Sequence, residues 1–176
     1  MSLEATRVLV LAADLFEDSE LLYPLLRLRE EGAEVTVATP DGGPVHGKKG
    51  HGPVPADASI EAVAADDFAA VVIPGGFAPD ALRKSDEALA LVRAFDAAAK
   101  PIAFICHAGW VPISAGIIDG RRATSVATIR DDMVNAGCVW EDSEVVVDGN
   151  LISSRHPGDL GPWLRTIITA LGGRVS

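Results

Sequence analysis

The sequence predicts an α/β fold in which helices cover both faces of a mostly parallel sheet. Short runs rich in valine, leucine and isoleucine, typical of buried strands, alternate with longer amphipathic segments typical of helices. Parallel strands joined by such helical crossovers form an open sheet that is covered on both sides. The chain has 176 residues and shows no internal repeat or linker, so residues 1–176 are predicted to form a single domain.

Six apolar runs are predicted to be strands. Valine and leucine are dense in the first of them, and the last two flank Asp148-Gly149-Asn150, a turn signature that predicts a hairpin. The runs cover residues 7–13, 34–38, 70–73, 101–105, 144–147 and 151–153.

Helices are predicted between these strands. Leu21, Leu25 and Leu28 lie on one face of the first helix, although Pro24 implies that this helix starts late or is kinked. The glycine- and proline-rich stretch 39–55 is too short for a linker between domains and is interpreted as an excursion or a small hairpin. Further helices are predicted at 87–99, 128–135 and 162–171.

Composition excludes several classes of partner. Twenty-five acidic and fifteen basic residues give a formal charge of −10, which argues against binding to nucleic acid or to an anionic membrane. No apolar run reaches the roughly 18 residues that cross a bilayer. The first residues lack the features of a signal peptide, so we expect a cytoplasmic protein.

The cysteines and histidines predict no metal site. Cys106 and Cys138 are expected to be free thiols in a cytoplasmic chain, and Cys138, with no base nearby, is interpreted as structural. His46 and His51 lack further ligands that would complete a metal site and are interpreted as surface residues. No phosphate-binding glycine fingerprint is present, so no cofactor is predicted.

Cys106 is the most informative residue of the chain. It follows the buried strand at 101–105, and Pro112 and Gly116 fit the first turn and the C-terminal cap of a helix just after it. A nucleophile on a sharp turn between a strand and a helix is the layout of a nucleophile elbow. Helix N-termini favour thiolates, so the pattern predicts a reactive Cys106 with a depressed pKa rather than a buried structural cysteine.

Three strand ends are expected to meet at one rim of the sheet, since groups beyond the carboxyl ends of parallel strands gather there. Glu17 follows the first strand and is predicted to contact the Cys106 sulfur with a pKa raised by partial burial. A simple helix-end charge is an equal alternative for Glu17. Gly75 and Gly76, with the His107 N–H, are predicted to donate to an oxyanion. A tight turn is compatible with that role.

Two histidines are candidates for the base that serves Cys106. His107 is adjacent in sequence, although neighbouring side chains on a turn diverge. His156 follows another strand and could reach the same rim. His107 is preferred, and His156 remains open.

The sequence resembles the PfpI (intracellular protease I) family, within the parkinsonism-associated deglycase superfamily. The resemblance rests on LAADLFEDSELLYPLLRLREEGAEV, VVIPGGFAPDALR, KPIAFICHAG, SAGIIDGRRATS, IRDDMVNAG and SEVVVDGNLISSR, and runs nearly from end to end. It implies a flavodoxin-like three-layer sandwich related to class I glutamine amidotransferases, and a homodimer or dimer-based higher oligomer. It also implies a hydrolase, described as peptidase, protein deglycase or glyoxalase-III-like, or a stress protein.

The resemblance also implies roles for individual residues. By position, Cys106 matches the family nucleophile and His107 the histidine beside it. Glu17 matches the carboxylic acid next to the thiol, and Gly76 with His107 matches the oxyanion-hole amides. Asp80 lies where protease-like members place a glutamate that orients the histidine of a neighbouring subunit, but it is one methylene shorter.

Two further positions depart from the family pattern. Trp110 lies in Ala108-Gly109-Trp110, which replaces the usual Gly-Pro-Gln, and is expected to narrow the pocket or stack on a substrate. His156 resembles the His-Pro-x-acid motif of amidotransferases, which keeps a Cys106–His156 pair open.

Two functions are consistent with these residues. One is a hydrolase that uses Cys106 covalently on small carbonyl compounds, peptides or glycated proteins. The other is a redox or stress sensor in which Cys106 is oxidised without turnover and Glu17 stabilises the product.

Overall fold

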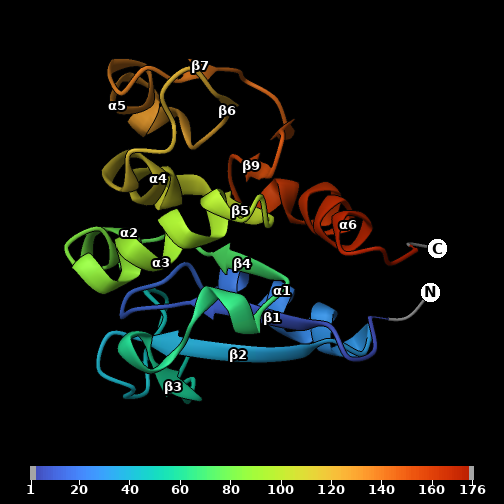
Figure 1. Cartoon of the computed structure of the whole chain (residues 1–176). Coiled ribbons are helices and arrows are strands. Elements are labelled where there is room, and N and C mark those ends of the chain that lie inside the picture. Colours follow the sequence, from blue (N-terminus) through green and yellow to red (C-terminus); the bar gives the residue numbers. More distant parts are fainter. Residues whose placement is uncertain (1–2, 175–176) are drawn as a thin grey trace.

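The computed structural model describes residues 3–174 and contains one large sheet in that range (Figure 1). Its strand order is β3-β2-β1-β4-β5-β9-β8. Neighbouring strands are parallel, except that β8 pairs with β9 as the predicted antiparallel hairpin. The strands are β1 (Arg7–Leu11), β2 (Glu34–Thr39), β3 (Ala58–Ser59), β4 (Ala70–Ile73), β5 (Ile102–Ile105), β8 (Val145–Asp148) and β9 (Leu151–Ser154).

Helices cover both faces of this sheet. On one face α3 contacts α4, and on the other α1 contacts α6, which confirms the predicted flavodoxin-like three-layer sandwich (Figure 1). In residues 3–174 no helix is both long enough and apolar enough to cross a membrane. The helices are α1 (Asp18–Glu30), α2 (Ala78–Leu82), α3 (Asp86–Ala97), α4 (Trp110–Ala115), α5 (Arg130–Asn135) and α6 (Leu160–Ala170).

Shorter elements connect the layers. Strands β6 (Arg122–Ala123) and β7 (Val139–Trp140) form a separate parallel pair near α5. Single turns of 3₁₀ helix are η1 (Ile60–Ala62), η2 (Ala65–Asp67), η3 (Cys106–Gly109), η4 (Ala127–Ile129) and η5 (Pro157–Asp159).

Helix α1 begins earlier than Pro24 suggested. It starts at Asp18 and includes Pro24 in its interior, where proline provides no N–H for the helical hydrogen bond to Glu20. The buried face of α1 tolerates this loss because tertiary packing, more than intrinsic propensity, stabilises such helices. The buried residues of α1 are Glu20, Leu21, Pro24, Leu25 and Leu28.

The stretch 39–55 is a folded excursion, as predicted. Val45 and Val54 form an antiparallel bridge across it, and Phe16 bridges both Gly47 and Gly76. The Asp18 carboxylate accepts hydrogen bonds from two backbone N–H groups of the loop. The excursion is therefore fastened beside the carboxyl end of β1.

The sheet order places the candidate site. Strand β1 lies between β2 and β4, so the connections leave it in opposite directions and open a crevice beyond the strand ends. The carboxyl ends of β1, β4 and β5 are neighbours there, as the sequence predicted.

Trp163 anchors α6 to the sheet. Its side chain is fully buried, and its indole N–H donates to the carbonyl of Ile152 at 3.1 Å. We predict that Trp163→Ala lowers the free energy of unfolding by about 3–5 kcal/mol, through loss of packing and the cavity left behind. Urea unfolding measures the change. The control Leu26→Ala, at a side chain 62% exposed, is expected to stay within roughly 0.5 kcal/mol of the parent.

Candidate active site

Cys106 lies on a sharp turn between β5 and α4. Its backbone has φ = +63°, a left-handed conformation that costs a non-glycine residue about 1–2 kcal/mol. The turn η3 leads directly into α4, which contains Pro112 and ends at Gly116 with φ = +74°. The predicted elbow geometry is present.

Two backbone amides face the Cys106 sulfur. The N–H groups of His107 and Gly76 both donate hydrogen bonds to it. Gly76 has φ = +81°, and a Cβ there would lie 2.3 Å from the backbone nitrogen of Glu17, so a side chain cannot be accommodated. These amides converge as an oxyanion hole requires, which supports the prediction for Gly76 and His107.

Gly75 has a different function from the one predicted. Its N–H donates to Glu20 Oε2 at 2.8 Å and is therefore unavailable for an oxyanion. A Cβ on Gly75 would lie 2.5 Å from Glu20 Oε2 and 2.8 Å from Cys106 Cβ. Because Gly75 has no side chain, Glu20 and Cys106 can approach each other at this position.

The acid beside the sulfur is Glu20, and the prediction of Glu17 was wrong on this point. Glu17 is the residue before α1, and its carboxylate pairs with Lys48 Nζ at 2.7 Å and Lys49 Nζ at 2.5 Å. Glu20 is one turn further on, where its side chain is fully buried and the backbone of Gly75 holds it. The lysines of the 39–55 excursion draw Glu17 away from the role that the sequence suggested.

The two glutamates have opposite shifts in pKa. Burial raises the pKa of Glu20 to about 7, against the Gly75 hydrogen bond and with a contribution from the charge of Glu17. Burial also acts on Glu17, but hydrogen bonds from Lys48 and Lys49 outweigh it and lower the pKa of Glu17. The raised pKa predicted for Glu17 was wrong. Near neutral pH Glu17 is ionised, whereas Glu20 is partly protonated.

The predicted depressed pKa of Cys106 was also wrong. Burial and the neighbouring Glu20 charge raise the pKa of the thiol to about 12, although the amides of His107 and Gly76 favour the thiolate. The residue is 7% exposed, so loss of hydration exceeds the effect of the helix terminus. Cys106 therefore rests as a thiol near neutral pH, and any attack by its sulfur would require loss of that proton.

His107 is placed to take that proton. Its Nδ1 lies 3.3 Å from Cys106 Sγ, and its Nε2 lies 3.3 Å from the hydroxyl of Thr128. Burial, together with the charge of Lys48, lowers the pKa of His107, which keeps the imidazole neutral near pH 7. The structure therefore supports His107 as the base, as preferred from the sequence.

Trp110 packs on this histidine. The two rings are 5.2 Å apart at a tilt of 57°, and the Trp110 indole N–H donates to Asp132 at 2.8 Å. The guanidinium of Arg83 lies 5.5 Å from the centre of the Trp110 ring. Trp110 thus forms a wall of the site next to His107, and stacking on a substrate stays a prediction.

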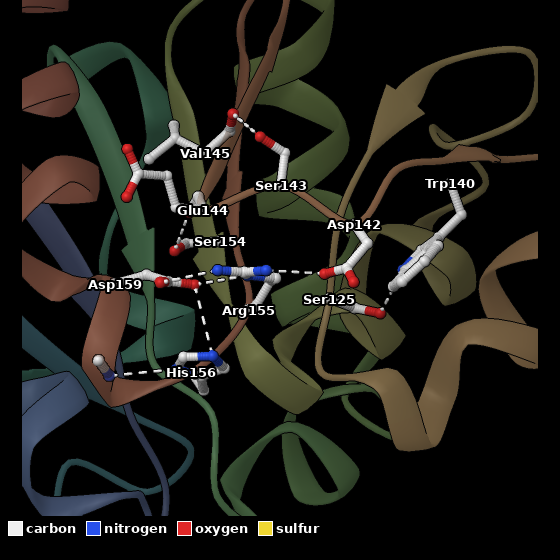
Figure 2. A network of polar contacts seen from close by, with 11 residues as sticks. Ser125, Trp140, Asp142, Ser143, Glu144, Val145, Ser154, Arg155, His156 and Asp159 are labelled. Carbon is white, nitrogen blue, oxygen red and sulfur yellow. Dashed lines mark hydrogen bonds and ion pairs between the residues drawn. The ribbon is translucent and has the colours of Figure 1, made fainter.

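His156 belongs to a separate polar network, which Figure 2 shows. Its Nδ1 accepts the N–H of Gly158, and its Nε2 faces the Asp159 carboxylate at 3.8 Å. Asp159 in turn is held by Arg155. No hydrogen bond or ion pair between His156 and Cys106 occurs in residues 3–174, so the structure gives the amidotransferase-like pair no support.

The remaining candidates lie apart from the thiol. Asp80 is exposed and pairs with Lys84 at 2.8 Å, so its role toward a neighbouring subunit stays a prediction. His46 and His51 are exposed, as predicted. Residues 3–174 contain no group of three or more histidine, cysteine, aspartate or glutamate side chains that could hold a metal ion. Both cysteines are free, and burial raises the pKa of Cys138 to about 11.

Sequence reasoning missed Glu20 and Thr128. A weak signal for Glu20 was present, because it lies four residues before Pro24, at the edge of the face that α1 buries. No comparable signal existed for Thr128, which comes close to His107 only through the path of a loop.

Comparisons with known proteins agree with this fold. A model of the DJ-1/PfpI family matches residues 6–170. Deglycase TK1284 from Thermococcus kodakarensis is 50% identical over 165 residues, which cover 94% of this chain and 99% of that protein. Protein/nucleic acid deglycase 2 from Escherichia coli is 41% identical over 168 residues, which cover 94% of this chain and 98% of that one.

A solved structure shows the same architecture. Drosophila melanogaster DJ-1beta superposes with a TM-score of 0.90 at 33% identity, and the match covers 99% of this chain and 92% of that one. With the family match over nearly the whole length, this chain belongs to the DJ-1/PfpI family.

Proposed function

We propose that the protein is a cysteine-dependent hydrolase of carbonyl substrates, of the deglycase type. The observation that carries the proposal is the environment of Cys106, whose sulfur has two amide donors, an imidazole nitrogen at 3.3 Å and a buried glutamate around it. Relatives named deglycases, 50% and 41% identical over most of the chain, support the same class of substrate.

The first step is attack by sulfur on a carbonyl carbon. As the S–C bond forms, the thiol proton passes to Nδ1 of neutral His107 and the carbonyl π electrons move to oxygen. The N–H groups of Gly76 and His107 hold the resulting oxyanion. With methylglyoxal, the oxyanion takes the proton back from His107 to give a hemithioacetal, and a proton shift between the two substrate carbons turns this into a lactoyl thioester. Water then cleaves the S–C bond, which releases lactate and restores the thiol without an external oxidant.

The protonation state of Glu20 sets the free-energy cost of forming the Cys106 thiolate. When Glu20 is ionised, two negative charges would meet in a buried site, and the thiolate is disfavoured. When Glu20 is protonated, that repulsion disappears and the acid can donate to sulfur. The role proposed from the sequence for Glu17 therefore passes to Glu20, three residues along the chain.

The substrate is a small carbonyl compound or a carbonyl adduct on an accessible side chain. Cys106 is 7% exposed, and Trp110 and His107 form one wall beside it. Such a site admits a compact group more readily than an extended peptide. Small carbonyl compounds and glycated proteins are thus favoured over peptides.

A redox sensor is a second candidate, and one observation favours it. Glu20 Oε1 is buried and makes no hydrogen bond within residues 3–174. Protonated Glu20 could donate from this atom to an oxygen of a Cys106 sulfinate, formed by a peroxide oxidant.

Cys106→Ala is predicted to abolish turnover, because no other thiol has the same partners. The assays are conversion of methylglyoxal plus water to lactate, and release of amine from a methylglyoxal-modified lysine derivative. The matched control Cys138→Ala is expected to retain the parent rate. A parent protein that shows no turnover in either assay, yet whose Cys106 is oxidised by dilute peroxide, would support the sensor instead.

Glu20→Gln is predicted to speed alkylation of Cys106 by iodoacetamide at pH 8, because the carboxylate that opposes the thiolate is removed. At pH 5.5, where Glu20 is already protonated, the change should have a much smaller effect. Mass spectrometry of the labelled peptide gives the rates. Glu17→Gln is the matched comparison, and an equal or larger effect from it would restore Glu17 as the acid beside the sulfur.

Stability should also depend on Glu20. Its pKa is near 7 in the folded protein and 4.5 when unfolded, so between these values the folded state binds more protons. The free energy of unfolding therefore falls as pH rises through this window, by an amount on the order of 3 kcal/mol from this group. In urea titrations from pH 4.5 to 7.5, Glu20→Gln should show a flatter decline than Glu17→Gln. Parallel curves for the two variants would contradict the raised pKa.

A further inference from the structure

His107 has a polar partner at each ring nitrogen, and both come from its own chain. Nδ1 faces Cys106 Sγ and Nε2 faces Thr128 Oγ1, each at 3.3 Å. Trp110 packs against the imidazole, with the two ring centroids 5.2 Å apart. The imidazole is thus held at three points.

The segment that carries Thr128 is fixed to the elbow. The N–H of Val126 donates to the Cys106 carbonyl at 3.4 Å. A Cβ on Gly109 would lie 3.2 Å from Ile129 Cδ1 and 2.7 Å from Met133 Sδ, so these buried side chains rest directly on the turn. Thr128, in η4, therefore has a defined position relative to the nucleophile despite being exposed.

We infer that Thr128 is the positioning residue that fixes the tautomer of His107, an inference that rests on the proposed use of His107 as the base. A neutral imidazole carries one N–H. Use of Nδ1 as the base requires its lone pair to face the thiol, so the N–H lies on Nε2 and donates to Thr128 Oγ1. After proton transfer from sulfur, the imidazolium donates to Thr128 from Nε2 and to the thiolate from Nδ1. The Thr128 hydroxyl therefore accepts the Nε2–H hydrogen bond from both the neutral imidazole and the imidazolium.

A hydroxyl suits this site better than a carboxylate. Its lack of charge leaves the imidazole neutral, whereas a carboxylate at Nε2 would stabilise the imidazolium and raise the pKa of His107. Asp80, which the sequence suggested as an orienting group from another subunit, pairs with Lys84 in its own chain. Thr128 supplies an orienting contact to Nε2 of His107 from the same chain.

Three threonine variants of the intact protein test this inference. Thr128→Val removes the hydroxyl at nearly constant shape, and Thr128→Ser keeps it. Thr169→Val, on α6, is the matched control, because it removes an exposed hydroxyl whose hydrogen bond within residues 3–174 is to the Arg165 carbonyl. Two-bond ¹H–¹⁵N correlation spectra give the His107 tautomer, with His107→Gln to assign the signals, and iodoacetamide labelling gives the reactivity of Cys106.

The parent, Thr128→Ser and Thr169→Val should all show the Nε2–H tautomer. Thr128→Val should show a mixture of tautomers, and its turnover should fall roughly fivefold to tenfold, the loss of one hydrogen bond. An unchanged tautomer in Thr128→Val, or a Thr128→Ser variant as impaired as Thr128→Val, would overturn the inference. A tautomer that shifts in Asp80→Asn but not in Thr128→Val would assign the role to Asp80.

The spectra separate this inference from the proposed function. If the parent protein holds the Nε2–H tautomer through Thr128 but turns over no carbonyl substrate, the positioning role of Thr128 stands and the proposed hydrolase function is rejected. If turnover needs Cys106 but is unchanged in Thr128→Val, the hydrolase function stands and the positioning role of Thr128 is rejected.

Discussion

The left-handed backbone of Cys106 is the constraint on which the site depends. A residue at φ = +63° in the centre of a parallel sheet ends its strand abruptly and directs its side chain into the crevice beyond the strand ends. The fold holds this conformation from two sides. The Val126 N–H donates to the Cys106 carbonyl, and the lack of a side chain on Gly75 leaves space for the Cys106 side chain. The free-energy cost of this left-handed conformation is small compared with the stabilisation gained by burying the apolar side chains of β5.

Adjacent glycines divide two tasks that the turn requires. Gly75 gives its N–H to Glu20, whereas Gly76, with φ = +81°, turns its N–H toward the sulfur. Because the peptide N–H groups of Gly75 and Gly76 point in different directions, this one segment both binds the buried Glu20 carboxyl group and supplies an amide to the anion site at the Cys106 sulfur. The acid itself is partly protonated near neutral pH, because burial, with a smaller contribution from the charge of Glu17, raises its pKa to about 7.

The fold was predictable because its signals are local and repeated. Buried parallel strands read as short apolar runs, and the hairpin at Asp148-Gly149-Asn150 has its own turn chemistry. The elbow was predictable for the same reason, since strand, cysteine and helix signals are contiguous. Element starts were less certain, because Pro24 left open a late start or a kink, and α1 in fact begins at Asp18 with Pro24 inside it.

The errors at the site came from interactions between distant segments. Glu17 and Glu20 have the same chemistry, and contacts with distant segments separate their roles. The lysines of the 39–55 excursion pair with Glu17, whereas the Gly75 N–H holds Glu20. The pKa of Cys106 was misjudged because a helix terminus is visible in sequence, whereas burial beside an acid is not. Thr128 escaped notice since a polar residue in a loop carries no signal until the loop is placed.

Acidity alone does not explain why Cys106 rather than Cys138 would react. Burial raises the pKa of both thiols, and that of Cys106 is the higher. The difference lies in what surrounds each sulfur when its proton leaves. Cys106 has an imidazole nitrogen to receive the proton and two amides directed at the sulfur, whereas the described neighbours of Cys138 include one backbone donor and two acids. Preorganised partners lower the barrier without a resting thiolate, which also keeps the resting thiol less open to unwanted oxidation.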